Sequence, residues 1–164
     1  MERPKRKSNR LRNYDYNTPG AYFLTICTKN GKYIFWERVG ASIARPQKPA
    51  LSRYGRLVDE AIREIPLHYP AVSVDHYVVM PNHIHLLLQI HTDADGRPMV
   101  APTVSRVVQQ LKGAITKRIG YSVWQKLFHD YVIRGEKDYW KIWQYIENNP
   151  AKWEEDCFYM EESL

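Results

Sequence analysis

The chain has 164 residues, of which 44% are hydrophobic, 26% charged and 13% aromatic, and its formal net charge is +6. This composition is typical of one globular domain with a sizeable core, and it excludes a disordered chain. The sequence contains no apolar run of about 18 residues, as a membrane-spanning helix requires, and no apolar signal peptide, so we expect a cytoplasmic protein with no membrane partner.

The charge is unevenly distributed along the chain. Residues 1–13 hold six basic residues and one acid, whereas residues 153–164 hold five acids and no base. We therefore predict a basic N-terminal arm over residues 1–13, a single domain over 14–153 and an acidic tail over 154–164. A basic domain with a basic arm favours a phosphate-rich partner, although a solubilising surface explains the same charge equally well.

The first segment after the arm has the pattern of a strand. A turn signal at Thr18-Pro19-Gly20 precedes residues 21–28, which are aromatic and β-branched. Asn30-Gly31 is a hairpin turn signal, so we expect a short return strand over residues 32–36. Residues 38–50 have the composition of a loop.

A helix and two strands are predicted next. Ser52 can cap a helix whose apolar residues recur with helical spacing as far as Ile65, and Pro66 is expected to end it. Residues 72–80 and 83–91 are strand-like, and a turn at Pro81-Asn82 separates them.

The last third of the chain predicts a helix, a strand and a final helix. Thr103 opens the first helix and Gly120 closes it, residues 128–133 form the strand, and the final helix covers 136–148 before Pro150. The complete order predicts an α+β fold, namely a ferredoxin-like or RRM-like antiparallel sheet with two helices on one face. The other face is left for a site that the final helix can approach.

The strand at residues 83–91 carries a candidate metal site. Alternation along a strand places Ile84 and Leu86 on the core face and His83 and His85 together on the other. Two imidazoles on one face can bind a single metal ion. Two solvated histidines on a half-buried strand are the alternative, and the spacing alone favours that alternative.

The final helix offers a second pair of candidate residues. Tyr145 and Asn149 are four residues apart, so they lie on one face of the helix. An Asn carbonyl is a hard oxygen ligand that suits Mg²⁺ or Mn²⁺, and a phenol beside a metal can attack a bound phosphate. The alternative is ordinary helix packing of one of 12 tyrosines, with Asn149 merely a C-terminal residue before proline, and the spacing alone favours that alternative.

Two motifs resemble the HUH family of single-tyrosine transposases. The stretch MPNHIHLLL resembles the histidine–hydrophobic–histidine motif of that family, and YIENNP resembles its nucleophile helix. The segments RLRNYDYNTPGAYFLTICT and VWQKLFHDYVIR add to the resemblance, which extends from about Arg10 to Trp153. The chain is most similar to the branch of REP-associated tyrosine transposases. Relatives among the insertion-sequence transposases usually carry Gln at the position of Asn149.

The resemblance implies a chemistry and a substrate. It assigns His83, His85 and Asn149 to a divalent metal, Mg²⁺ or Mn²⁺, and Tyr145 to nucleophilic attack on single-stranded DNA through a 5′-phosphotyrosine. The expected substrate is single-stranded or hairpin DNA from repeats, and the expected protein is a prokaryotic, nucleoid-associated monomer or homodimer. A non-catalytic ferredoxin-like nucleic-acid-binding module and a hydrolase that uses water stay open as alternatives.

Basic residues in two segments are candidate DNA contacts, and solvated side chains are the alternative for each. Asp130 and His129 are candidates for a general base, with a structural or surface role as the alternative. The candidate contacts lie in the arm and on the second predicted helix: Arg3, Lys5, Arg6, Lys7, Arg10, Arg12, Lys112, Lys117 and Arg118.

Overall fold

A four-stranded antiparallel sheet forms the centre of the fold. The computed structural model describes residues 14–16, 18–37, 50–93, 95–96 and 102–159. The strands lie in the order β2-β3-β1-β4, and their bounds are Gly20–Cys27 for β1, Val72–Val79 for β2, His83–Ile90 for β3 and His129–Val132 for β4. All three pairings between neighbouring strands are antiparallel.

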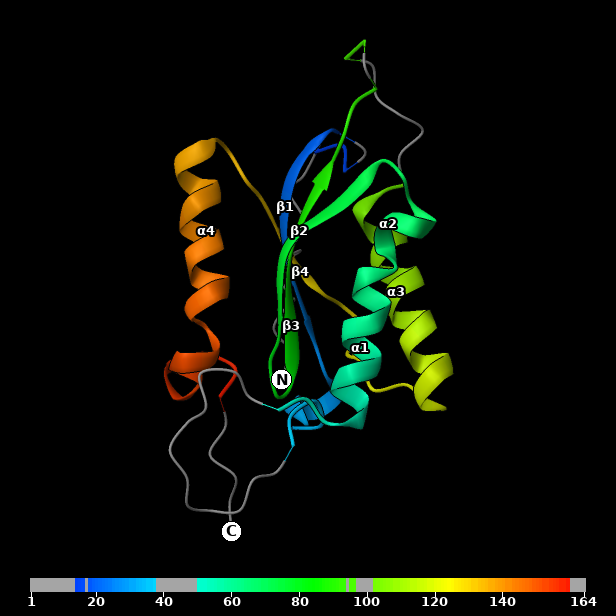
Figure 1. Cartoon of the computed structure of the whole chain (residues 1–164), viewed down its shortest axis with the longest axis vertical. Helices are drawn as coiled ribbons and strands as arrows, with labels where there is room; N and C mark the ends of the chain where they lie inside the picture. The colour runs from blue at the N-terminus through cyan, green and yellow to red at the C-terminus, as the bar shows by residue number, and fades with distance from the viewer. Residues whose placement is uncertain (1–13, 17, 38–49, 94, 97–101, 160–164) are drawn as a thin grey trace, which may run out of the picture.

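Helices cover both faces of this sheet. Helices α1 (Arg53–Arg63), the short α2 (Ile65–His68) and α3 (Val104–Ile119) lie on one side, and α4 (Glu136–Asn148) lies on the other (Figure 1). The predicted ferredoxin-like α+β plan, with the final helix on the face opposite the helix pair, is confirmed. None of the helices in the described part of the chain combines the length and apolarity that a membrane crossing requires.

The two long helices on the core side begin at the predicted capping residues. Ser52 Oγ accepts a hydrogen bond from the Gly55 amide over 3.1 Å, and Thr103 Oγ1 accepts one from the Arg106 amide over 3.1 Å. Each bond satisfies an amide that has no partner within its own helix. Helix α3 ends at Gly120, whose φ of 96° is the left-handed conformation that glycine adopts without strain.

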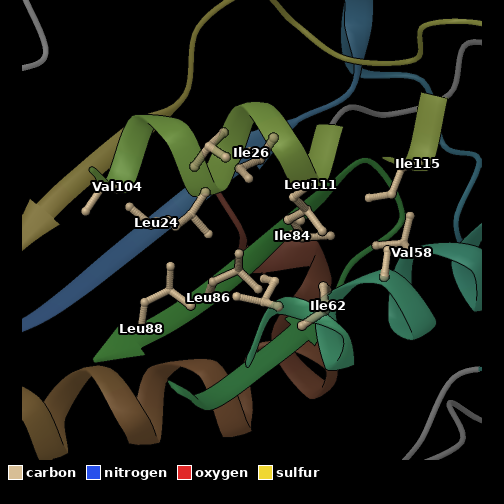
Figure 2. Packing of buried hydrophobic residues seen from close by; sticks show 14 of the residues in the cluster. Leu24, Ile26, Val58, Ile62, Ile84, Leu86, Leu88, Val104, Leu111 and Ile115 are labelled. Carbon is tan, nitrogen blue, oxygen red and sulfur yellow. The ribbon is translucent and has the colours of Figure 1, made fainter. Parts of the chain in front are cut away.

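The hydrophobic core lies between the sheet and the helix pair. Figure 2 shows apolar side chains of the two central strands meeting those of α1 and α3. Because side chains alternate along a strand, this packing turns the intervening residues of β3 toward α4. The central contacts come from Leu24, Ile26, Val58, Ile62, Ile84, Leu86, Leu88, Leu111 and Ile115.

The predicted hairpin after β1 is wrong. Residues Lys29–Gly31 form a 3-10 turn, and no strand follows between residues 32 and 36 in the described chain. Both edges of β1 are already paired, one with β3 and the other with β4. The segment instead joins the turn before β3, where the Ile34 and Phe35 amides donate to the Pro81 carbonyl.

Two prolines begin helical turns rather than ending a helix. Pro66 lies in the first turn of α2, which starts two residues after α1 ends, and Pro150 opens a 3-10 helix over Pro150–Glu155. Proline is well tolerated in a first turn, since the amide that it lacks has no helical partner there. The second of these turns carries the chain back toward the sheet after α4.

Helix α4 is attached to β2 through a bulge in that strand. The register shifts between Val74 and His76, and Tyr139 Oη donates to Asp75 Oδ2 over 2.8 Å. The His76 ring stacks on Trp143 with 4.3 Å between centroids and 14° between planes. These contacts hold α4 across the face of the sheet that carries the odd-numbered residues of β3.

Candidate metal and nucleophile site

His83 and His85 lie side by side on the α4 face of the sheet. Both side chains are buried, with 0% and 1% exposure, and their Nε2 atoms are 3.0 Å apart. The sequence prediction that the two rings share one face of a strand is therefore met. They are buried rather than solvated because α4 and the segment after it cover this face.

A polar partner orients each imidazole through its other nitrogen. His83 Nδ1 lies 2.8 Å from Asn82 Oδ1, and His85 Nδ1 lies 2.9 Å from Thr25 Oγ1, which the strand register places opposite it. The Asn82 carbonyl oxygen accepts only, so His83 carries its proton on Nδ1 and presents a lone pair on Nε2. Such partners are typical of histidines that bind metals, since they fix the tautomer and the ring direction.

Burial keeps both histidines neutral. Desolvation lowers the pKa of His83 and of His85 from the ordinary 6.5 to about 3. When His85 donates from Nδ1 to Thr25, two nitrogen lone pairs face each other at Nε2. A cation between the two nitrogens relieves that repulsion, so the pair fits a metal.

Helix α4 brings Tyr145 and Asn149 to the same place. The Tyr145 ring centroid is 5.3 Å from that of His85, and 42% of the residue is exposed. Asn149 follows the helix as its C-terminal cap and is only 4% exposed. Its Oδ1 atom is buried and has no hydrogen-bond partner in the described chain, which makes it available to a cation.

Asp156 is a component of the site that sequence reasoning missed. Its Oδ2 atom lies 2.9 Å from Asn149 Nδ2, 3.4 Å from Tyr145 Oη and 4.0 Å from His83 Nε2. No periodicity or motif distinguishes this residue from the other acids after Pro150. The 3-10 turn that folds it back onto the sheet became apparent only in the structure.

The surroundings of Tyr145 hold its phenol in the protonated form. Burial, followed by the negative charge of Asp156, raises the pKa of Tyr145 from 10 to about 12. A phenol becomes a good nucleophile only when its proton is removed. Loss of the Tyr145 proton is therefore favoured by a positive charge beside the phenol, and a cation can bind at the histidine pair.

A cavity of about 460 Å³ opens beside the tyrosine. Lys141 lies one helical turn before Tyr145, and Lys152 follows shortly after the end of α4. A nucleophile flanked by ammonium groups suits a phosphodiester, whose charge lysine neutralises. The wall of the cavity includes Lys141, Gln144, Tyr145, Asn148, Lys152 and Asp156.

The candidate general bases occupy opposite faces of the sheet. The register pairs His129 with Thr25, on the side of the metal site, and Asp130 with Leu24, on the core side. Asp130 is therefore directed away from Tyr145.

The candidate DNA contacts on α3 lie away from the tyrosine. Lys112 Nζ donates to the Gln125 carbonyl over 2.8 Å, and Arg118 pairs with Glu64. Both belong to α3, on the opposite side of the sheet from α4 (Figure 1), as does the exposed Lys117. The six basic residues of the arm, Arg3, Lys5, Arg6, Lys7, Arg10 and Arg12, fall outside the described residues.

Comparison with known proteins finds two relatives of the chain in one bacterium. No protein-family model matches it. An uncharacterized Haemophilus influenzae protein is 31% identical, with 95% of this chain and 94% of that protein covered. A second H. influenzae protein, named as a candidate REP-associated tyrosine transposase, is 28% identical over 84% of this chain and 74% of its own length.

A solved structure shares the fold. It is a REP-associated tyrosine transposase bound to a REP hairpin, with a TM-score of 0.62 and 22% identity over 89% of this chain and 74% of that one. The fold, the sequence relationship and the histidine and tyrosine motifs agree. The chain is thus similar in sequence to a candidate REP-associated tyrosine transposase and similar in fold to a solved one.

Proposed function

We propose that this protein is a metal-dependent endonuclease and strand transferase for single-stranded DNA, with Tyr145 as its nucleophile. The observation that carries the proposal is the packing of Tyr145, which lines a cavity, against the buried His85, whose Nε2 atom lies 3.0 Å from that of His83. A water-using hydrolase has no need of a tyrosine at that point. A non-catalytic binding module has no need of two buried imidazoles that face each other.

His83, His85 and Asn149 would hold a divalent metal, Mg²⁺ or Mn²⁺. The donors fit such an ion, since neutral imidazole and amide oxygen are accepted ligands and the Asn149 Oδ1 atom is buried without a partner. Bound there, the ion would supply Lewis-acid stabilisation of the charge that develops on the scissile phosphate. The low pKa values of both histidines leave them free to bind it at neutral pH.

Tyr145 performs the covalent step. Its oxygen forms a bond to phosphorus, the bond from phosphorus to the 3′ oxygen breaks, and the phenol proton is lost as the 3′ oxygen gains one. The products are a 5′-phosphotyrosine and a free 3′-OH. Attack by a new 3′-OH reverses the step, so joining proceeds without ATP because the phosphotyrosine conserves the energy of the phosphodiester.

The cavity beside Tyr145 accounts for the choice of substrate. Lys141 and Lys152 line it and would neutralise phosphates next to the scissile one. The solved relative is bound to a REP hairpin, and we propose hairpin-containing repeat DNA for this chain also. We propose that a DNA substrate of this kind keeps the protein at the nucleoid.

One copy of the chain supplies every residue that we propose for the site. Tyr145 lies 5.3 Å from His85 of the same chain, measured between ring centroids. We therefore propose that cleavage takes place in cis, so that a monomer is competent.

Covalent capture tests the proposal. The protein is incubated with single-stranded hairpin DNA from the flanks of its own gene and Mn²⁺ or Mg²⁺, and adducts are resolved on denaturing gels. Wild type should form an adduct, and Tyr145→Phe should bind the same DNA and form none. The matched control is Tyr121→Phe, which removes an exposed phenol just beyond α3, across the sheet from α4, and should leave the adduct yield unchanged.

The position of the adduct makes the test specific. Peptide mapping should place the DNA on the segment from Ile142 to Lys152. A linked peptide that contains Tyr139 or Tyr131 would show that the nucleophile is misassigned. Binding that survives chelation, with no adduct or cleavage from wild type, would favour the non-catalytic module, and cleavage without adduct would favour the hydrolase.

A further inference from the structure

Three groups of the site converge on a single carboxylate oxygen that lies beyond α4. Asp156 Oδ2 accepts hydrogen bonds from Asn149 Nδ2 and Tyr145 Oη and lies 4.0 Å from His83 Nε2. We infer that Asp156 is a direct ligand of the catalytic metal, together with His83 and His85. This inference rests on the proposed function, and it adds a ligand from the segment that follows the nucleophile helix.

The separations between donor atoms suit one small cation. In an octahedral site with bonds of about 2.1 Å, adjacent donors lie about 3.0 Å apart and opposite donors about 4.2 Å apart. The Nε2 atoms of His83 and His85 are 3.0 Å apart, and Asp156 Oδ2 is 4.0 Å from His83 Nε2. All three donors lie within 4.8 Å of one another, so a cation can reach them with small movements of the side chains.

The charge of this cluster also requires a cation. The Asp156 side chain is 0% exposed, and its hydrogen bonds in the described chain come from neutral groups, namely Asn149, Tyr145 and the Phe158 amide. A buried carboxylate without a positive partner costs several kcal/mol, and a divalent ion between these three donors removes that cost.

Asn149 and the turn after α4 direct the carboxylate toward the histidines. The Asn149 side-chain amide donates a hydrogen bond to Asp156 Oδ2, the oxygen that faces His83. Metal ligands are often oriented by such a hydrogen bond from a neighbouring group. The 3-10 helix Pro150–Glu155 reverses the chain immediately before Asp156. Because Tyr145 Oη is 3.4 Å from the ligand oxygen, metal binding at Asp156 also places the nucleophile next to the metal.

Calorimetric titration of Mn²⁺ into the full-length protein tests the assignment without any assay of activity. Asp156→Asn keeps the shape and removes the charge, and we expect its Mn²⁺ affinity to fall by at least about tenfold. Glu155→Gln is the matched control, because it removes an adjacent, exposed acid and should leave the affinity within about twofold. Circular dichroism verifies that each variant is folded, and His83→Ala supplies the reference loss of binding.

A change of metal preference separates a ligand from a residue that is merely structural. A thiolate is a soft ligand, so Asp156→Cys should gain affinity for Cd²⁺ relative to Mn²⁺, and Glu155→Cys should not. Two results would overturn this inference: an Asp156→Asn variant that binds Mn²⁺ as tightly as wild type, or the same Cd²⁺ preference in both cysteine variants. If His83→Ala still abolishes binding, either result leaves the proposed function intact. If wild type binds no metal, the metal dependence of the proposed function fails as well.

Discussion

At the scale of single residues, the buried histidine pair makes the fold sensitive to acid. The folded-state pKa of each imidazole lies near 3, below the ordinary value of 6.5, because burial disfavours the charged form. Above pH 6.5 neither the folded nor the unfolded chain protonates these rings. Below pH 6.5 the two imidazoles bind protons in the unfolded chain but not in the folded chain, so the free energy of unfolding falls as the pH drops from 6.5 toward 3.

We predict a measurable loss of stability for the metal-free protein between pH 6 and pH 4.5. Each histidine should lower the free energy of unfolding by up to about 1.4 kcal/mol per pH unit. Urea titrations in EDTA at a series of pH values measure this loss. Replacing both His83 and His85 by Asn should flatten the dependence, whereas His68→Gln, at an exposed ring, should leave it unchanged. Equal dependence in wild type and the double variant would contradict the prediction.

At the scale of elements, the docking of α4 determines whether the nucleophile reaches the metal. This helix has a single fully buried residue, Ile146, so specific contacts with β2 supply much of its attachment. His76 contributes twice, since its ring stacks on Trp143 and its Nε2 atom lies 2.9 Å from Glu147 Oε2. Offset or stacked aromatic pairs of this kind stabilise by about 0.5–1.5 kcal/mol beyond the area they bury.

We predict that Trp143→Ala loosens α4 and lowers both stability and adduct formation. The loss of a half-buried aromatic side chain should cost roughly 1.5–3 kcal/mol, which thermal unfolding measures. Adduct yield should fall at least as far as Mn²⁺ affinity, because Tyr145 and Asn149 both depend on α4, whereas the metal keeps His83 and His85 on β3. Trp140→Ala is the control, at a position of the same helix that is 51% exposed, and its unfolding temperature should stay near that of wild type. Identical losses in the two variants would argue against the stacking role.

At the scale of the whole molecule, we propose that the predicted basic arm contributes to the electrostatics of DNA binding. Residues 1–12 carry six basic side chains and one acid, although the chain as a whole has a net charge of only +6. Each contact with a phosphate releases counterions, so each contact makes the DNA affinity fall more steeply as the salt concentration rises. The arm can thus be tested without knowledge of its conformation.

We predict that deletion of residues 1–12 weakens binding of single-stranded DNA and flattens its dependence on salt. The slope of log affinity against log salt should decrease by up to about 4, since each of six contacts contributes about 0.7. Fluorescence polarisation across a salt series measures both quantities. Lys117→Gln, at an exposed position of α3, which lies across the sheet from α4, should change the slope by less than one contact. An unchanged slope after deletion would show that the arm does not touch phosphates.

The local parts of this molecule were determined by its sequence. Alternation along β3 put His83 and His85 on one face, and helical spacing put Tyr145 and Asn149 on one side of α4. The helix starts after Ser52 and Thr103 were predictable for the same reason, since a cap depends on residues three positions away. Each of these properties involves neighbours within about one helical turn or one strand.

Only the tertiary structure decided how those parts meet. The segment after Asn30 forms no strand because β3 and β4, from distant parts of the sequence, occupy both edges of β1. The histidines are buried because α4 crosses their face, and Asp156 lies beside them because the chain reverses after Pro150. Strand partners and chain reversals depend on competition between segments far apart in sequence, which no local pattern records.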